Sequence, residues 1–314
     1  MNRWIFVLAI VLGATALGCV GKPPTSATSG KPKVVATFSV LGDFVTQIAG
    51  DHIELVTLVG ADGDAHEYQP TPQDVAAIGR ADVVFENGVK FEAGWFDKSY
   101  AASQSKAKRV ATTDGLKLIE GDPDHKHTDP EPDHEHEQDP HVWHEVNNAI
   151  HMVGKIRDGL CEIDPANAAN YRANADAYVA RLKALDGWIV QTVETLPKDR
   201  RKLVTSHDTF GYFAKRYGFQ VLGSVLPSFS TEVADPSAAD FAKLVEQVRK
   251  ANVKAIFCET SHNNKLVERL AQAAGVNVAP PLYTDSLGGA DTPAATYEGM
   301  MRSNVTTIVG ALKP

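Results

Sequence analysis

Short apolar runs alternate with amphipathic stretches along most of the chain, and this alternation predicts its secondary structure. Runs rich in β-branched residues predict strands, and apolar residues at every third or fourth position predict helices. Strands are predicted at 33–38, 54–59, 81–85, 109–111, 202–205, 221–226, 254–259 and 276–279. Helices are predicted at 41–49, 74–80, 91–100, 145–161, 210–217, 236–251, 265–274 and 296–312. Strands that alternate with helices indicate an α/β fold with mainly parallel sheets.

One further helical stretch, 166–196, is much longer than the others. It contains Ala, Leu, Tyr and charged residues, and no Pro occurs before Pro197. A helix of about thirty residues is about 45 Å long, enough to span a domain. A chain of 314 residues is long enough for two hydrophobic cores. We therefore divide it into two lobes and the long helix between them. The predicted parts are an N-terminal α/β lobe (32–165), a linker helix (166–197) and a C-terminal α/β lobe (198–314).

The first nineteen residues have the pattern of an export signal and do not belong to the fold. Arg3 precedes an apolar run that ends in Ala16-Leu17-Gly18-Cys19, which is similar to a bacterial lipobox with Cys19 as the lipidated residue. Cleavage by an ordinary signal peptidase after Ala16 is the alternative. Residues 20–31, rich in Gly, Pro, Ser and Thr, predict a flexible tether. We expect a membrane-anchored periplasmic lipoprotein, or a soluble periplasmic protein if Cys19 carries no lipid.

Net charge excludes one class of partner. The formal net charge is −8, and the sequence contains no basic stripe that would neutralise phosphates, so nucleic acid is not an expected ligand. An acidic balance is compatible with a cation as ligand.

An acidic segment rich in histidine interrupts the alternation at 122–138. It contains Asp, Glu, Pro and no aliphatic residue, so it cannot bury apolar surface. Imidazoles and carboxylates on a flexible segment are ligands for a divalent metal such as zinc. We interpret the segment as an auxiliary loop that collects zinc, with a solvated acidic linker as the alternative. Its histidines are His125, His127, His134 and His136.

Four short motifs place a candidate metal ligand after a predicted strand or on a turn, where ligand sites of open α/β sheets collect. They are DAHEYQP (64–70), DPHVW (139–143), SHDTFGYF (206–213) and YTDSLG (283–288). Each histidine alone is more often a helix cap or a surface residue, and Asp285 alone fits a simple turn. A hydrolase triad at 206–208 is not supported, because adjacent residues do not face one another on a strand and no G-x-S-x-G motif is present.

Taken together, the export signal, the four motifs in this order, the histidine-rich insert and the long helix resemble one family. It is the family of zinc- and manganese-specific solute-binding lipoproteins of ABC importers (ZnuA/TroA-like, cluster A-I), and the resemblance covers nearly all of 32–314. It implies two similar α/β lobes, joined by one rigid helix, with the metal in the cleft between them. It also implies four metal ligands, which fall on His66, His141, His207 and Asp285.

The ligand set and the insert favour zinc over manganese. Three imidazoles and one carboxylate suit Zn²⁺, whereas Mn²⁺ prefers more oxygen ligands. Manganese members of the resembled family have Glu where His207 stands, and long histidine-rich inserts accompany the zinc members. We therefore predict Zn²⁺ as the transported ligand, with Mn²⁺ as the lesser option. Because neutral imidazoles bind the metal, affinity is expected to fall below about pH 6.

We make further predictions for four residues that lie close in sequence to the candidate ligands. Asp64, Asp139 and Asp208 are predicted to orient the histidine rings. His144 departs from the family pattern, which often has Leu or Met there, and lies three residues after His141. We predict a surface residue at a helix start, with a spare ligand or a link to the histidine-rich loop as alternatives.

The function that the resemblance implies is capture and not catalysis. We expect a monomeric protein that binds zinc and delivers it to a cognate ABC permease and its ATPase, with a lipid anchor as its sole contact with the membrane. A manganese transport component, a metal-dependent adhesin and a zinc-buffering surface lipoprotein are the alternatives. A zinc hydrolase is disfavoured because it needs an open coordination position beside a general base.

Overall fold

The computed structural model describes Met1 and residues 30–120, 138–233, 235–261 and 263–313, and each predicted strand and helix is present. The strands are β1 (Lys33–Phe38), β2 (Glu54–Val59), β3 (Val83–Glu86), β4 (Lys108–Ala111), β5 (Lys202–His207), β6 (Gln220–Leu226), β7 (Ala255–Glu259) and β8 (Asn277–Leu282). The α-helices are α1 (Ser39–Ala49), α2 (Pro72–Arg80), α3 (Ala93–Ser103), α4 (Val146–Ile163), α5 (Ala168–Glu194), α6 (Gly211–Tyr217), α7 (Ala238–Ala251), α8 (Lys265–Ala274) and α9 (Tyr297–Leu312).

Several predictions fall outside the described residues. They concern the export signal with Cys19, nearly all of the tether, and the four histidines of the insert, His125, His127, His134 and His136. They stay predictions. At the two ends of the insert, Glu120 and Gln138 pair in a single antiparallel bridge, which brings the flanking chain together.

The pairings between these strands are all parallel, as predicted. The first four strands form a sheet in the order β2-β1-β3-β4. In the second half β5 pairs with β6 and β7 pairs with β8, and β5 lies beside β7. Both halves therefore follow the same strand order, and the α/β class is confirmed. The lobe boundaries at 32–165, 166–197 and 198–314 stay predictions.

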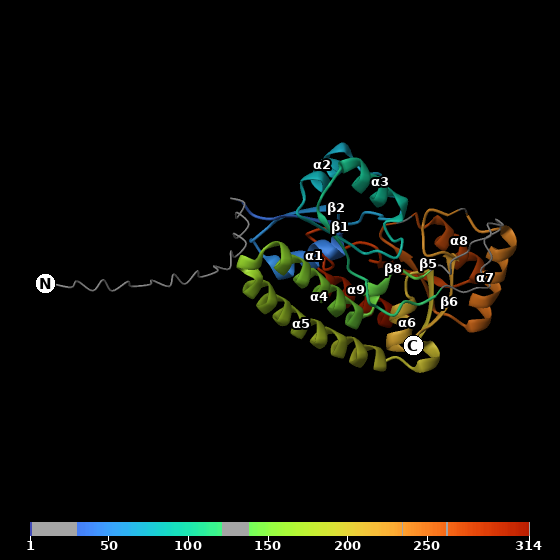
Figure 1. Ribbon diagram of the computed structural model, residues 1–314. Coiled ribbons are helices and arrows are strands. Elements are labelled where there is room, and N and C mark those ends of the chain that lie inside the picture. The colour runs from blue at the N-terminus through green and yellow to red at the C-terminus, as the bar shows by residue number, and fades with distance from the viewer. Residues whose placement is uncertain (2–29, 121–137, 234, 262, 314) are drawn as a thin grey trace. The chain divides into compact units, whose positions relative to one another are not determined.

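The long helix α5 forms one wall of the larger hydrophobic core. It spans 27 residues, runs along α4 and also contacts α1 and α9 (Figure 1). Its buried side chains recur every three or four positions, as expected for one buried face: Ala168, Tyr171, Ala175, Tyr178, Leu182, Leu185, Ile189 and Val193. The larger core extends from the first sheet through α5 to α9, and a smaller core lies among β5–β7, α7 and α8.

Strand β8 is longer than the sequence predicts. It continues through Pro280 and Pro281 to Leu282. Proline is tolerated there because β8 pairs only with β7 among the described strands, so the missing N–H groups break no second ladder. Among the described residues, no helix is both long and apolar enough to cross a membrane.

Two glycines of α4 provide a matched test of its packing. A Cβ atom on Gly159 would lie 2.8 Å from Cε1 of Phe85, whereas no atom lies within 4 Å of that position on Gly154. We expect Gly159→Ala to lower the free energy of unfolding by about 1–3 kcal/mol through overpacking. Gly154→Ala should raise it by about 0.5–1 kcal/mol. Urea unfolding followed by circular dichroism measures both, and equal effects would contradict the close approach of α4 to β3.

Candidate metal site

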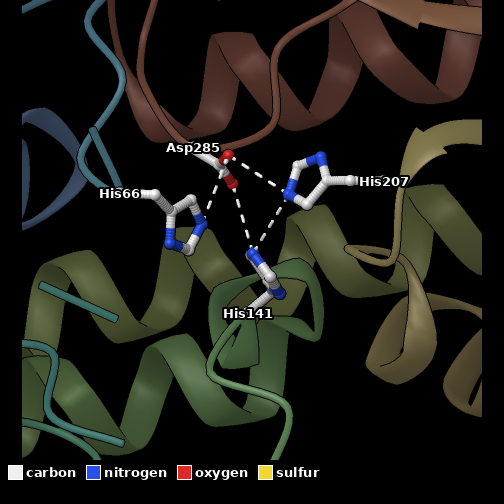
Figure 2. Close-up of side chains that lie close together, drawn as sticks. All are labelled: His66, His141, His207 and Asp285. Carbon is white, nitrogen blue, oxygen red and sulfur yellow. Dashed lines mark hydrogen bonds and ion pairs between the residues drawn. The ribbon is translucent and has the colours of Figure 1, made fainter. Parts of the chain in front are cut away.

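The four predicted ligand side chains converge at one point (Figure 2). One nitrogen or oxygen from each of His66, His141, His207 and Asp285 lies within 4.8 Å of the others, and all four side chains are buried. Asp285 Oδ2 lies 3.3 Å from Nε2 of His207 and 3.7 Å from Nε2 of His66. Asp285 Oδ1 lies 3.5 Å from Nε2 of His141. The Nε2 atoms of His141 and His207 are 3.3 Å apart.

The shortest of these separations are close to the edges of a tetrahedral metal site. Zinc bonds of about 2.0–2.1 Å give donor-to-donor distances of about 3.3–3.4 Å in a tetrahedron. Four of the distances in this group are 3.3, 3.3, 3.5 and 3.7 Å. The distances to Asp285 use both of its oxygens, and the donor atoms of the group are within 4.8 Å of one another. The four side chains can therefore surround one small divalent cation if they draw closer together.

The loop that carries His66 is held by residues of its own motif. Asp64 Oδ1 accepts a hydrogen bond from the backbone N–H of His66 at 2.8 Å. Thr71 caps α2 through a reciprocal capping box with Asp74, and the hydroxyl of Tyr68 donates to Asp74 Oδ2 at 2.8 Å. The residues around His66 thus fix where the loop enters the helix.

His141 is fixed by the residue two positions before it. Asp139 Oδ1 lies 2.9 Å from both the backbone nitrogen and Nδ1 of His141, which turns Nε2 toward the other candidate ligands. The hydroxyl of Tyr212 donates to the backbone oxygen of Asp139 at 3.0 Å. Gly211 is required beside them, because a Cβ atom there would lie 2.6 Å from Asp139 Oδ2. The role predicted for Asp139 agrees with these contacts.

His207 ends β5 and is held by a glutamate that the sequence analysis missed. Glu259, the last residue of β7, lies 2.9 Å from Nδ1 of His207 through Oε2, and its Oε1 accepts from the backbone N–H of His207 at 3.2 Å. Thr284 donates to Glu259 Oε2 at 2.6 Å. Glu259 therefore lies against Nδ1 of His207, and the role predicted for Asp208 stays a prediction. A carboxylate at the end of a predicted strand was the available signal.

Asp285 lies between β8 and α9, in a segment that residues of the first half hold in place. Indole Nε1 of Trp143 donates to the backbone oxygen of Thr284 at 2.9 Å. The hydroxyl of Ser39 accepts from the backbone N–H of Leu287 at 2.8 Å. Two of the candidate ligands come from each half of the chain, and contacts between the halves fix the carboxylate among the imidazoles.

The pKa values of His66 and His207 are shifted in opposite directions. Burial lowers the pKa of His66 to about 4, and the neighbouring His141 and His207 add to the shift, so its imidazole is neutral at pH 7. Burial alone would also lower the pKa of His207, but the carboxylates of Glu259 and Asp285 outweigh it and raise the pKa to about 10. Burial raises the pKa of Asp139 to about 8.

His144 is not the surface residue that the sequence suggested. Its side chain is 0% exposed, and its ring lies 4.7 Å from the ring of Phe210. Neither ring nitrogen has a hydrogen-bond partner within the described part of the chain. Burial lowers its pKa to about 3. The prediction failed because His144 ends a short buried 3₁₀ helix, Val142–His144, and does not begin α4.

Comparison with known proteins agrees with the fold. The family model described as "ZnuA: Zinc-uptake complex component A periplasmic" matches residues 34–311. The chain belongs to this family. The resemblance inferred from the motifs is therefore confirmed, and with it membership among the substrate-binding proteins of metal ABC transporters.

Relatives in the family are named for different metals. The manganese-binding lipoprotein MntA of Halalkalibacterium halodurans is 33% identical over 316 residues, 99% of each chain. The zinc-binding protein TroA of Treponema pallidum is 35% identical over 292 residues, 91% of each chain. The iron ABC transporter substrate-binding lipoprotein MtsA of Streptococcus pyogenes is 31% identical over 313 residues, 96% of this chain and 97% of MtsA.

A solved structure supports the same architecture. The structure of the periplasmic zinc-binding protein TroA from Treponema pallidum aligns with a TM-score of 0.79 at 32% identity, covering 91% of this chain and 100% of that one. The α/β fold with its parallel sheets and long helix is therefore shared with a solved member of the family.

The raised pKa of His207 predicts that metal binding releases a proton. Below its pKa of about 10, His207 holds a proton that must leave before Nε2 can bind a cation. Affinity should then fall up to about tenfold for each unit that the pH is lowered through the neutral range, and not only below about pH 6. Calorimetry at about pH 7.5 in buffers of different ionisation enthalpy should give at least about one released proton.

Glu259→Gln is the matched variant for this measurement. It keeps the shape of the side chain but removes the charge beside Nδ1, so the pKa of His207 and the proton count should both decrease. A count near zero in the unchanged protein, or an affinity that does not change between about pH 7 and 8.5, would contradict the protonated state of His207.

His144→Leu tests the cost of a buried imidazole without partners. An apolar side chain of similar size removes two buried polar atoms, so we expect the free energy of unfolding to rise by about 1 kcal/mol. Metal affinity should stay within about twofold of the unchanged protein, a difference of about 0.4 kcal/mol. Chemical denaturation and metal titration measure the two quantities. A loss of affinity would instead support the spare-ligand alternative.

Proposed function

We propose that this protein is the zinc-binding component of an ABC importer, and that His66, His141, His207 and Asp285 bind the ion. The observation that carries the proposal is the convergence of three imidazoles and one carboxylate, all buried, within 4.8 Å. A closed site made wholly of protein ligands suits capture, whereas catalysis by zinc requires a coordination position left open for water or substrate. The proposed activity is therefore reversible binding and not turnover.

The donor set favours zinc over the other metals for which relatives are named. Zinc accepts four tetrahedral ligands with several imidazoles, whereas manganese prefers more oxygen donors. Asp139 and Glu259 lie against Nδ1 of His141 and His207, an arrangement that orients the rings and increases their basicity. Manganese binding is the alternative, because MntA of Halalkalibacterium halodurans is named for that metal at 33% identity.

The rest of the chain fits a transport component. Residues 1–19 would direct export, and a lipid on Cys19 would hold the mature protein at the membrane on the periplasmic side, with 20–31 as the tether. The partners would be a cognate permease and its ATPase, and the protein would act as a monomer with lobes 32–165 and 198–314 joined by 166–197. The insert 122–138 would raise the local zinc concentration through weak, exchangeable binding.

Zinc and manganese titrations of the protein and of His207→Ala test the proposal. We expect tight zinc binding and weak manganese binding by the unchanged protein. Loss of an orienting residue typically costs 10–100-fold in affinity, so loss of a direct ligand in His207→Ala should weaken zinc binding by at least about 100-fold. Isothermal calorimetry, with a competing chelator for the tight state, measures the affinities.

Replacement of the insert histidines by serine is the control. The variant His125→Ser, His127→Ser, His134→Ser, His136→Ser should keep the tight site and lose only weak binding. Tight zinc binding that survives His207→Ala but disappears in this variant would place the site in the insert and contradict the proposal. Tighter binding of manganese than of zinc would favour the manganese alternative.

A further inference from the structure

His66 differs from the other three candidate ligands in its exposure. The residue is 4% exposed, whereas His141, His207 and Asp285 are 0% exposed. His207 ends a strand, but His66 lies in the irregular connection between β2 and α2. An ion in the site can leave only if some part of its surroundings moves. The side of the site that carries His66 requires the least movement, because it is nearest to solvent.

A short segment after β6, residues 228–231, bridges the loops that carry His66 and His207. At one end, the backbone oxygen of Ser228 accepts from the backbone N–H of Asp208 at 3.0 Å, one residue after His207. At the other end, the hydroxyl of Thr231 donates to Asp64 Oδ2 at 2.8 Å, two residues before His66. We refer to residues 228–231 as the strap.

The strap passes close to the candidate ligands between its two ends. The ring of Phe229 lies 6.4 Å from the ring of His141, centroid to centroid. Ser228 and Thr231 are each 8% exposed, so both ends of the strap are buried. The strap therefore places an aromatic ring beside the site.

One carboxylate joins the strap to the ligand loop. Asp64 Oδ1 accepts from the backbone N–H of His66, while Asp64 Oδ2 accepts from the hydroxyl of Thr231. A hydrogen bond to an ionised carboxylate is stronger than one between neutral groups. Movement of the His66 loop away from the second half of the chain must break the bond to Thr231 or pull the strap with it.

We propose that the Thr231–Asp64 hydrogen bond is a latch that sets how fast the bound metal leaves. The inference rests on the proposed function, because it takes His66 as a metal ligand. Thr231 and Asp64 act as positioning residues: neither is assigned to the ion, and each holds the loop that presents Nε2 of His66. With the latch closed, His66 stays in place and Phe229 stays beside His141; with it open, the loop can carry His66 away.

The test is the rate of zinc release to excess chelator, followed by stopped flow on the unchanged protein and on variants of Thr231. Thr231→Val keeps the shape and removes the hydroxyl, so release should become at least about tenfold faster, as expected for loss of a hydrogen bond to a charged group. Thr231→Ser keeps a hydroxyl and should restore a rate near that of the unchanged protein. Ser230→Ala is the matched control, because Ser230 Oγ accepts from the backbone N–H of Glu232 within the same connection.

A double-mutant cycle with Asp64→Ala separates the latch from a general weakening of the loop. If the two side chains act only through their mutual bond, Thr231→Val should add no further acceleration in the Asp64→Ala background. Independent, multiplying effects on the rate would overturn the proposal. So would a release rate in Thr231→Val equal to that of the unchanged protein.

The same measurements distinguish failure of the latch from failure of the proposed function. If the unchanged protein binds zinc tightly and His207→Ala does not, the site stands, and the rates of the Thr231 variants decide the latch alone. If the unchanged protein does not bind zinc tightly, or His207→Ala binds it equally well, the proposed site and the latch are both wrong.

Discussion

Burial of three imidazoles and one carboxylate within 4.8 Å is the constraint on which the rest of the structure depends. Polar groups are costly to bury unless partners are fixed in place, and charges more so. The chain supplies these partners by joining segments far apart in sequence. Glu259 holds His207 across 52 residues, and Trp143 donates to the backbone beside Asp285 across 141 residues. The site is therefore an outcome of the whole fold and not of one loop.

Burial and the neighbouring charges give His66 and His207 different protonation states before any ion binds. His66 is neutral because burial disfavours its charge, whereas two carboxylates keep His207 protonated. A proton between Glu259 and Asp285 lowers the repulsion between two buried acids. A divalent cation can replace that proton and serve the same purpose. Competition between proton and metal for one position follows directly from this geometry.

The apolar periodicity of the sequence predicted the strands and helices well. It failed where contacts between residues far apart in the sequence determine the local structure. Each strand and helix lies where the apolar pattern placed it, but the strand before Asp285 extends through Pro280 and Pro281 because its outer edge is unpaired among the described strands. His144 was predicted to be a surface residue because it precedes the predicted helix 145–161. Its burial depends on a 3₁₀ turn and on Phe210, far along the chain, and neither leaves a local signal.

The candidate ligands could be predicted because four weak motifs occur together, whereas the residues that support them could not all be found this way. Asp139 stands two positions from His141, so proximity in sequence was a sufficient guide. Glu259 and Thr231 reach their partners only through the packing of strands and connections, across 52 and 167 residues. Local sequence reports which side chains can bind a metal.

Long-range contacts decide how firmly each candidate ligand is held, and they hold the four unequally. His207 is at the end of a strand, and the carboxylate of Glu259 lies against its ring. The backbone on both sides of Asp285 is hydrogen-bonded to side chains of the first half. His66 is in a loop that is linked to the second half by the hydroxyl of Thr231, which donates to Asp64, and by the backbone oxygen of Leu287, which accepts from the backbone N–H of Asp62. A site that must both capture and deliver an ion needs some ligands that stay fixed and at least one that can move. His66, which lies in an irregular connection and is the most exposed of the four candidate ligands, meets that requirement.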